Sequence, residues 1–197
     1  MRKEHFRRKV MKNCSKNYNW SLKCYLIIFI SKGTIIGVKK EVNCMNIQKF
    51  TQKSIEAINN CEKIAYDYGN QEIDQEHFLY SLMTIEDSLI ANLIEKMNID
   101  KDIFLKNIEQ LLNQKNKVSG DVKLYISNDL NKVLVNAEDE AKRMGDSYVS
   151  VEHLMLALIA APNRAIKQLF KTYGINRESF LSVLATAVSY THLTLPT

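Results

Sequence analysis

Two Glu-His pairs, Glu76-His77 and Glu152-His153, have the residue types and the spacing that could do chemistry in this sequence. Each glutamate is expected in the first turn of a helix, where a carboxylate complements the helix dipole by about 0.3–1 kcal/mol. The same carboxylate could instead make a polar contact to a bound ligand. Neither histidine has a second ligand four residues away on its own helix. We therefore expect core or capping histidines and no metal site.

A nucleotide site is not expected either. A P-loop needs glycines whose backbone N–H groups cradle phosphates, followed by Lys and then Ser or Thr. The sequence holds no Gly-Lys pair, and the stretch from Gly33 to Lys39 has the wrong spacing and no Ser or Thr after the lysine. We predict that this chain is not an enzyme and has no catalytic residue, metal or cofactor of its own.

The two Glu-His pairs belong to a longer self-similarity, because Thr51 to Leu105 repeats without a gap as Ser127 to Leu181, 76 positions later. The matched residues include Glu62 with Glu138, Ala65 with Ala141, Gly69 with Gly145, Leu82 with Leu158, Ile90 with Ile166 and Phe104 with Phe180. A register kept over 55 positions, with the apolar places in step, indicates a duplicated helical unit. Two copies suit one domain whose halves share a core.

Each unit is predicted to form four helices from apolar residues at helical spacing. The first helix spans about residues 51–68 in unit one and 127–144 in unit two. Hydroxyl N-caps begin these two helices, and glycines with positive φ end them. The predicted caps and ends are Thr51, Ser127, Gly69 and Gly145 for the first helices, Asp74 and Ser150 for the second, and Asn98 and Gly174 for the third.

No alternating strand pattern is present, so we predict an all-α fold: a duplicated four-helix repeat with about eight helices and pseudo-twofold symmetry. Unit one spans 48–114, a polar linker spans 115–126 and unit two spans 127–188. The domain as a whole spans 45–188. A groove along the seam between the two docked units is the natural place for a partner.

The charge divides at residue 44. Residues 1–44 hold 11 Lys or Arg and two acidic residues, whereas the rest holds 16 basic and 20 acidic residues, a balance of −4. The repeat domain is therefore mildly acidic, and we expect no nucleic-acid surface on it. The unpaired Cys61 lies on a helical apolar stripe and is predicted to be a core residue in a reducing compartment.

The basic leader, residues 1–44, has three interpretations. Its apolar run, Cys24 to Ile30, is far shorter than the roughly 20 residues that span a membrane. A signal peptide would need a small-residue cleavage site, which is absent. We favour the third interpretation, because Lys40-Glu41-Val42 can be encoded as a bacterial ribosome-binding sequence two codons before Met45. The leader would then be translated upstream sequence, with Met45 as the initiator.

The other end of the chain, residues 189–197, breaks the helical pattern. It looks like a translated sequencing-adapter tail, and the alternative is a short natural extended segment. We predict a non-native tail without function, beyond which a larger protein continues.

The second unit carries the residues of a family resemblance. Asp129 to Leu134, Ala137 to Ala141 and the run Gly145-Asp146-Ser147-Tyr148-Val149-Ser150-Val151-Glu152-His153-Leu154 resemble the amino-terminal domain of Clp ATPases, and most closely that of ClpB disaggregases. The opening Met45 to Thr51 is also similar to the start of a ClpB chain. The resemblance covers about residues 45–188.

The resemblance implies a mobile helical domain attached to two ATPase modules of a cytoplasmic homohexamer that threads aggregated proteins through its pore. In that family the domain catches unfolded or aggregated clients and does no chemistry, while ATP and Mg²⁺ bind to the modules outside this chain. The alternative is a ClpC- or ClpA-type domain, which binds adaptors and, in ClpC, phosphorylated arginine. Neither nucleic acid nor a membrane is an expected partner.

The resemblance also implies where clients are bound. Thr51, Asp146 and Glu152 match positions at which ClpB domains carry polar residues associated with substrate handling, and Glu76 is the counterpart of Glu152 in unit one. Each has a structural alternative. Thr51 can be an N-cap, Asp146 can be a turn residue, and the two glutamates can serve the helix dipole.

Overall fold

The structure, a computed structural model, describes residues 47–118 and 123–191, all within the compact part that spans Asn43–Thr197. The leader 1–44 and residues 192–197 of the predicted tail lie outside the described residues. The backbone of 189–191 is helical.

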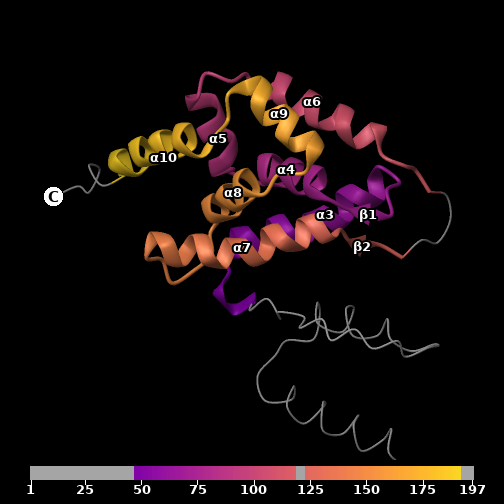
Figure 1. The fold of residues 1–197 in the computed structure, drawn as a ribbon, viewed down its shortest axis with the longest axis horizontal. Helices are drawn as coiled ribbons and strands as arrows, with labels where there is room; N and C mark the ends of the chain where they lie inside the picture. The colour runs from indigo at the N-terminus through magenta and orange to yellow at the C-terminus, as the bar shows by residue number, and fades with distance from the viewer. Residues whose placement is uncertain (1–46, 119–122, 192–197) are drawn as a thin grey trace, which may run out of the picture. The chain divides into compact units, whose positions relative to one another are not determined.

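The described residues form eight α-helices, four in each unit, so the predicted duplicated helical repeat is confirmed (Figure 1). Unit one contains α3 (Gln52–Asp67), α4 (Gln75–Thr84), α5 (Leu89–Lys96) and α6 (Lys101–Gln114). Unit two contains α7 (Asn128–Met144), α8 (Val151–Ala160), α9 (Arg164–Tyr173) and α10 (Arg177–Thr191). A short 3₁₀-helix, η2 (Ile47–Lys49), precedes α3. Helix α8 begins and ends 76 residues after α4, which is the offset of the repeat.

The predicted N-caps also form. Thr51 Oγ1 accepts a hydrogen bond from Ser54 N at the start of α3, and Ser127 Oγ accepts one from Leu130 N at the start of α7. Gly145 ends α7 with a φ of 81°, a conformation that costs glycine little because it has no Cβ.

Helices α4 and α8 lie at the centre of the fold, between α3 and α7 on one side and the remaining helices on the other (Figure 1). They are buried along most of their length, as expected of helices surrounded by others. They pack against each other and against helices of both units, so the two halves share one core. Across this core the rings of Phe104 and Tyr173 meet edge to face, with their ring centroids 5.0 Å apart.

The predicted all-α fold is confirmed, and the structure adds one strand pair of two residues each. Strand β1 (Glu72–Ile73) pairs in parallel with β2 (Tyr125–Ile126). Strand β2 lies within the segment 115–126 that was predicted as a linker. The pairing Ile73↔Ile126 has a pseudo-twofold mate in the bridge Phe50↔Val149. Strands of two residues are too short to produce an alternating pattern, so periodicity could not reveal them.

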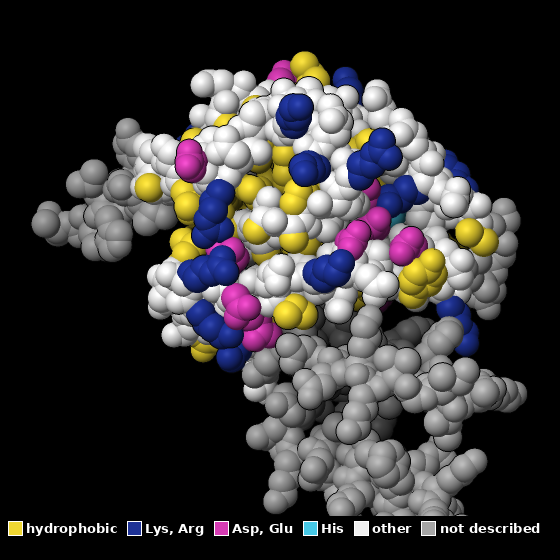
Figure 2. All heavy atoms as spheres, in the orientation of Figure 1, with side chains coloured by type: hydrophobic (Ala, Val, Ile, Leu, Met, Phe, Trp, Pro, Cys, Tyr) yellow, Lys and Arg dark blue, Asp and Glu magenta, His cyan; other side chains and the backbone are white. Residues whose placement is uncertain are grey.

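Charges of both signs are interspersed on the face shown in Figure 2, with apolar side chains between them. Among the described residues, no helix is long and apolar enough to cross a membrane. Cys61 is buried in the core as predicted, and its burial raises the pKa of the thiol to about 12.

Candidate functional site

The two units present equivalent clusters at the N-terminal ends of α4 and α8. We call them the α4 end and the α8 end. The α4 end comprises Asn70, Asp74, Glu76, His77 and Ser127, and the α8 end comprises their counterparts Asp146, Ser150, Glu152, His153 and Thr51. Each end is built from both units, because the residue that caps the first helix of one unit lies against the loop before the second helix of the other.

The α8 end brings three of the predicted site residues together. Thr51 N donates to the carbonyl of Val149 at 3.0 Å, which fixes the start of α3 against the loop that carries Asp146 and leads to Glu152. Ser54, one turn into α3, donates from Oγ to the same carbonyl at 2.9 Å. Thr51, Asp146 and Glu152 therefore lie around one junction between the units.

His153 holds this loop in place. Its Nδ1 accepts a hydrogen bond from Ser150 N at 3.1 Å, so the proton of the neutral ring resides on Nε2. Nε2 lies 3.0 Å from Oδ2 of Asp146, whose side chain is 53% exposed. Asp146 thus has one oxygen directed toward the buried ring while about half of its side chain is exposed to solvent.

Glu152 is half-buried in the first turn of α8. Within 47–118 and 123–191, no hydrogen bond or ion pair to its carboxylate is formed. Two large apolar side chains of the same region, Met144 and Tyr148, are 41% and 60% exposed. The α8 end therefore presents the half-buried Glu152 carboxylate beside exposed apolar surface.

The α4 end has the same backbone frame. Ser127 N donates to the carbonyl of Ile73 at 2.9 Å, Asp74 N donates to His77 Nδ1 at 3.1 Å, and His77 Nε2 lies 3.0 Å from Asn70 Oδ1. Both predicted capping histidines are thus confirmed as buried capping residues. Burial, and next the nearby charge of Lys115, lower the pKa of His77 to about 4, so this ring is neutral near pH 7.

Glu76, the fourth predicted site residue, is placed differently from Glu152. It is 3% exposed, and its Oε1 accepts a hydrogen bond from Asn163 Nδ2 at 3.0 Å. Lys115 Nζ lies 2.9 Å from Glu76 Oε2 and 2.9 Å from Asp74 Oδ2. Glu76 is therefore occupied within the fold and is not brought to the surface with the other three residues.

The ion pairs of the α4 end also shift pKa values. Burial alone would raise the pKa of Asp74, but hydrogen bonds from Lys115, Ser127 and Gln75 N outweigh it and lower the pKa. Burial alone would lower the pKa of Lys115, but its contacts with Glu76 and Asp74 raise it. The charged forms of both partners are thus favoured.

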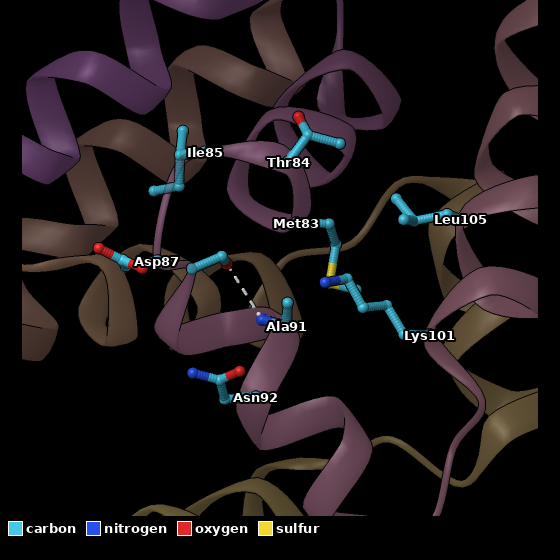
Figure 3. Close-up of a pocket in the computed structure, with 9 residues that line it drawn as sticks. Met83, Thr84, Ile85, Asp87, Ala91, Asn92, Lys101 and Leu105 are labelled. Carbon is cyan, nitrogen blue, oxygen red and sulfur yellow. Dashed lines mark hydrogen bonds between the residues drawn. The ribbon is translucent and has the colours of Figure 1, made fainter.

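A separate hollow of about 460 Å³ lies in unit one between α4, α5 and α6 (Figure 3). Met83, Lys101 and Leu105 approach one another there from α4 and α6, and Ser88 Oγ accepts a hydrogen bond from Ala91 N at 3.1 Å. Its lining contains no nucleophile activated by a neighbouring base. Sequence reasoning gave no sign of this hollow, because its residues come from three different helices.

In the described part of the chain, no group of three His, Cys, Asp or Glu side chains is placed to hold a metal ion. Sequence reasoning gave neither Tyr148 nor Lys115 a role at a site. Tyr148 had a usable signal in the sequence, since it is a large side chain in the turn between Gly145 and the N-cap Ser150, and turns lie at the surface. Lys115 had none, because its partners lie about 40 residues earlier in the chain.

Comparison with known proteins gives a family match. The profile of the Clp repeat (R) N-terminal domain matches residues 49–173. The chaperone protein ClpB of Clostridium tetani is 36% identical over 144 residues, which is 71% of this chain and 17% of that protein. The chain thus spans about a sixth of the length of the curated relatives that it matches.

Solved structures share the fold. The Hsp104 N-terminal domain from Candida albicans has a TM-score of 0.58 at 22% identity, covering 68% of this chain and 88% of that one. The N-domain of ClpV, in a complex with a VipB peptide, has a TM-score of 0.57 at 17% identity, covering 78% of this chain and 97% of that one.

Proposed function

Because this chain belongs to the family of Clp repeat N-terminal domains, we propose that it engages protein clients for an ATP-dependent chaperone of the ClpB type. Unfolded or aggregated proteins would be its clients. The ATP and Mg²⁺ of such a chaperone would be bound by ATPase modules outside the region that matches this family, and the assembled protein would be a homohexamer.

The observation that carries the proposal is the α8 end. Glu152 has no partner among the residues described, Asp146 is largely exposed, and Thr51 is held beside them by the Val149 carbonyl. A carboxylate in this setting can accept hydrogen bonds from the backbone or from cationic side chains of an extended segment. Exposed Tyr148 supplies apolar contact area with little loss of side-chain freedom. The VipB peptide bound to the ClpV N-domain supports a peptide ligand for a domain of this fold.

Binding of the 197-residue chain to fluorescently labelled, reduced and carboxymethylated α-lactalbumin, followed by anisotropy, tests the proposal. We expect weak, saturable binding to this unfolded protein and none to native α-lactalbumin. Glu152→Gln should weaken binding about 10-fold, because a charge-assisted hydrogen bond of roughly 1.5–3 kcal/mol is replaced by a neutral one of roughly 0.5–1.5 kcal/mol.

The matched control is Glu178→Gln, since Glu178 is an exposed glutamate in the first turn of α10. It should leave the affinity unchanged. Equal affinities of the Glu152 and Glu178 variants would contradict the proposed site. Equal binding of unfolded and native α-lactalbumin would contradict client engagement itself.

A second candidate function is an adaptor- and phosphoarginine-binding domain of the ClpC or ClpA type. It is favoured by the unpartnered Glu152 carboxylate, which could pair with a guanidinium group, and disfavoured at Glu76, which already pairs with Lys115. Calorimetric titration with phosphoarginine separates the two functions. Saturable binding that is lost in Glu152→Ala supports the second function, and no heat of binding supports the first.

A further inference from the structure

The acidic pair of the α4 end already binds a cation, and that cation belongs to the same chain. Lys115 Nζ lies 2.9 Å from one carboxylate oxygen of Asp74 and 2.9 Å from one of Glu76. Oε2 of Glu76 is completely buried and has no hydrogen-bond partner in the part of the chain that the structure describes, so its contact with Lys115 Nζ is an ion pair. The Lys115 ammonium group is therefore the positive charge that offsets the negative charge of this buried oxygen.

Among the residues that the structure describes, the α8 end has no equivalent of this contact. The position 76 residues after Lys115 is the uncharged Thr191, the last residue of α10. The counterpart of Asn163, which donates to Glu76, is Asp87, an exposed acid that cannot donate to Glu152. Within the described structure, one end thus holds a cation of its own chain and the equivalent end does not.

We propose that Lys115 is an intramolecular ligand of the α4 end, where Asp74 and Glu76 form a cation site that binds a primary ammonium side chain of another chain once Lys115 leaves. This site would be distinct from the α8 end, and its existence does not depend on client binding there. It takes a lysine-like group because two carboxylate oxygens surround a single ammonium nitrogen, which donates in three directions.

Lys115 sits where its release requires little rearrangement. It follows the last residue of α6 in an extended conformation, and it leads into residues 116–118. This short segment is attached to unit one by hydrogen bonds from Val118 N to the Gly69 carbonyl and from Asn70 Nδ2 to the Asn116 carbonyl. Breaking such peripheral contacts opens a segment locally without unfolding the core.

Thermal unfolding of the 197-residue chain with n-butylammonium chloride as the probe tests the proposal. Lys115→Ala should lower the Tm by roughly 5–10 °C, because it leaves two carboxylates without their counter-ion. Butylammonium should restore at least half of this loss in a saturable manner, and sodium chloride at equal ionic strength should not. The wild type should gain nothing from butylammonium beyond the effect of sodium chloride, since its site is filled.

Lys117→Ala is the matched control, because Lys117 lies in the same segment but is exposed and contacts Asn113. It should behave as the wild type does. A Lys115→Ala chain that is as stable as the wild type, or that gains no more from butylammonium than from sodium chloride, would overturn the proposal.

If Lys115→Ala fails to fold, Lys115→Gln keeps the proposal testable, because the amide retains donors without the charge. Butylammonium should then shift the amide resonances of Gln75 and Ser127 saturably, and the absence of any shift would overturn the site. No client is present in either experiment, so failure of this proposal and failure of client binding at the α8 end are distinguishable.

Discussion

The α4 end and the α8 end share a backbone frame and differ in the side chains that fill it. In both, a cap residue donates to the loop of the other unit and a buried histidine accepts from the residue that begins its helix. At the α4 end, Gln75, Asn163 and Lys115 complete a buried polar network. The counterparts of Gln75 and Asn163 at the α8 end are Val151 and Asp87, which form no such network in the described structure.

This difference indicates a division of labour after duplication. The frame is kept because backbone N–H and C=O groups at the junction must be paired wherever they are buried. Side chains are free to diverge once the frame is complete. One end then joins the units through paired polar side chains, and in the described structure the other leaves the Glu152 carboxylate unpaired. Variants that exchange the properties of the two ends are therefore the sharpest tests.

The largest expected contrast is between Glu76→Ala and Glu152→Ala. Glu76→Ala removes a buried carboxylate and leaves Lys115 and Asn163 without it, so we expect about 3 kcal/mol of lost unfolding free energy. Glu152→Ala should change the unfolding free energy by less than about 1 kcal/mol, because its carboxylate interacts with the helix dipole but has no intramolecular partner among the described residues. Urea unfolding followed by circular dichroism measures both values.

Equal losses in these two variants would show that the asymmetry has no energetic meaning. Glu76→Gln refines the result, since the amide keeps the volume and can still accept from Asn163. A loss for Glu76→Gln close to that for Glu76→Ala would assign the effect to the charge that pairs with Lys115.

The pH dependence of stability sharpens the comparison further. The pKa of His77 is about 4 in the folded chain against 6.5 in the unfolded chain, so the unfolded state binds more protons between these values. The contribution of His77 to the free energy of unfolding should be fully present above about pH 6.5. The free energy of unfolding should then fall by about 3 kcal/mol as the pH drops toward 4. The lowered pKa of Asp74 has a separate effect, because its contribution is lost only as the pH falls below about 3.8.

Urea unfolding at pH 7, 5.5 and 4 measures this dependence, and His77→Gln is the informative variant. It should be less stable than the wild type at pH 7 but should lose much less stability on acidification to pH 4. An unchanged difference between pH 7 and pH 4 in this variant would exclude His77 as the source.

A smaller effect is expected when the α4 end is given the residue of the α8 end. Gln75 is completely buried, donates from Nε2 to the carbonyl of Ala161 at 2.9 Å and accepts from Asn163 N at 2.6 Å. Gln75→Val leaves these buried groups unpaired and should cost about 2 kcal/mol. Gln71→Val is the control with an expected cost below about 0.5 kcal/mol, because Gln71 is only partly buried. Similar midpoints of urea unfolding for the two variants would contradict the role of the network.

Much of this fold could be predicted from the sequence because its signals are local. The starts of α4 and α8 followed from Asp74 and Ser150, which have cap-forming side chains before apolar runs. The gap-free repeat then required the two halves to be alike. Strands β1 and β2 could not be predicted, because two paired residues produce no periodicity and their pairing depends on docking of the units.

The candidate site divides in the same way. The positions of Thr51, Asp146 and Glu152 on caps, turns and first turns were readable, since each is a property of a few neighbouring residues. The different burial of Glu76 and Glu152 was not, because it arises from Asn163 in the other unit and from Lys115 at the end of α6. Repeats in a sequence reveal equivalent positions, but they do not reveal which equivalent positions the rest of the chain covers.

The smallest expected effect concerns a pair of helix ends that are equivalent in backbone and different in residue. Gly174 after α9 has a φ of 66°, and its counterpart after α5, Asn98, has a φ of 60°. A Cβ at Gly174 would meet no atom within 4 Å, so Gly174→Ala costs only the backbone strain of about 1 kcal/mol. Gly174→Asn should cost about half as much, because asparagine tolerates this conformation better than alanine does. Urea midpoints that fall from wild type to Gly174→Asn to Gly174→Ala would show that both units require the same left-handed backbone conformation at the end of their third helix. The reverse order would mean that α9 ends under constraints that α5 does not share.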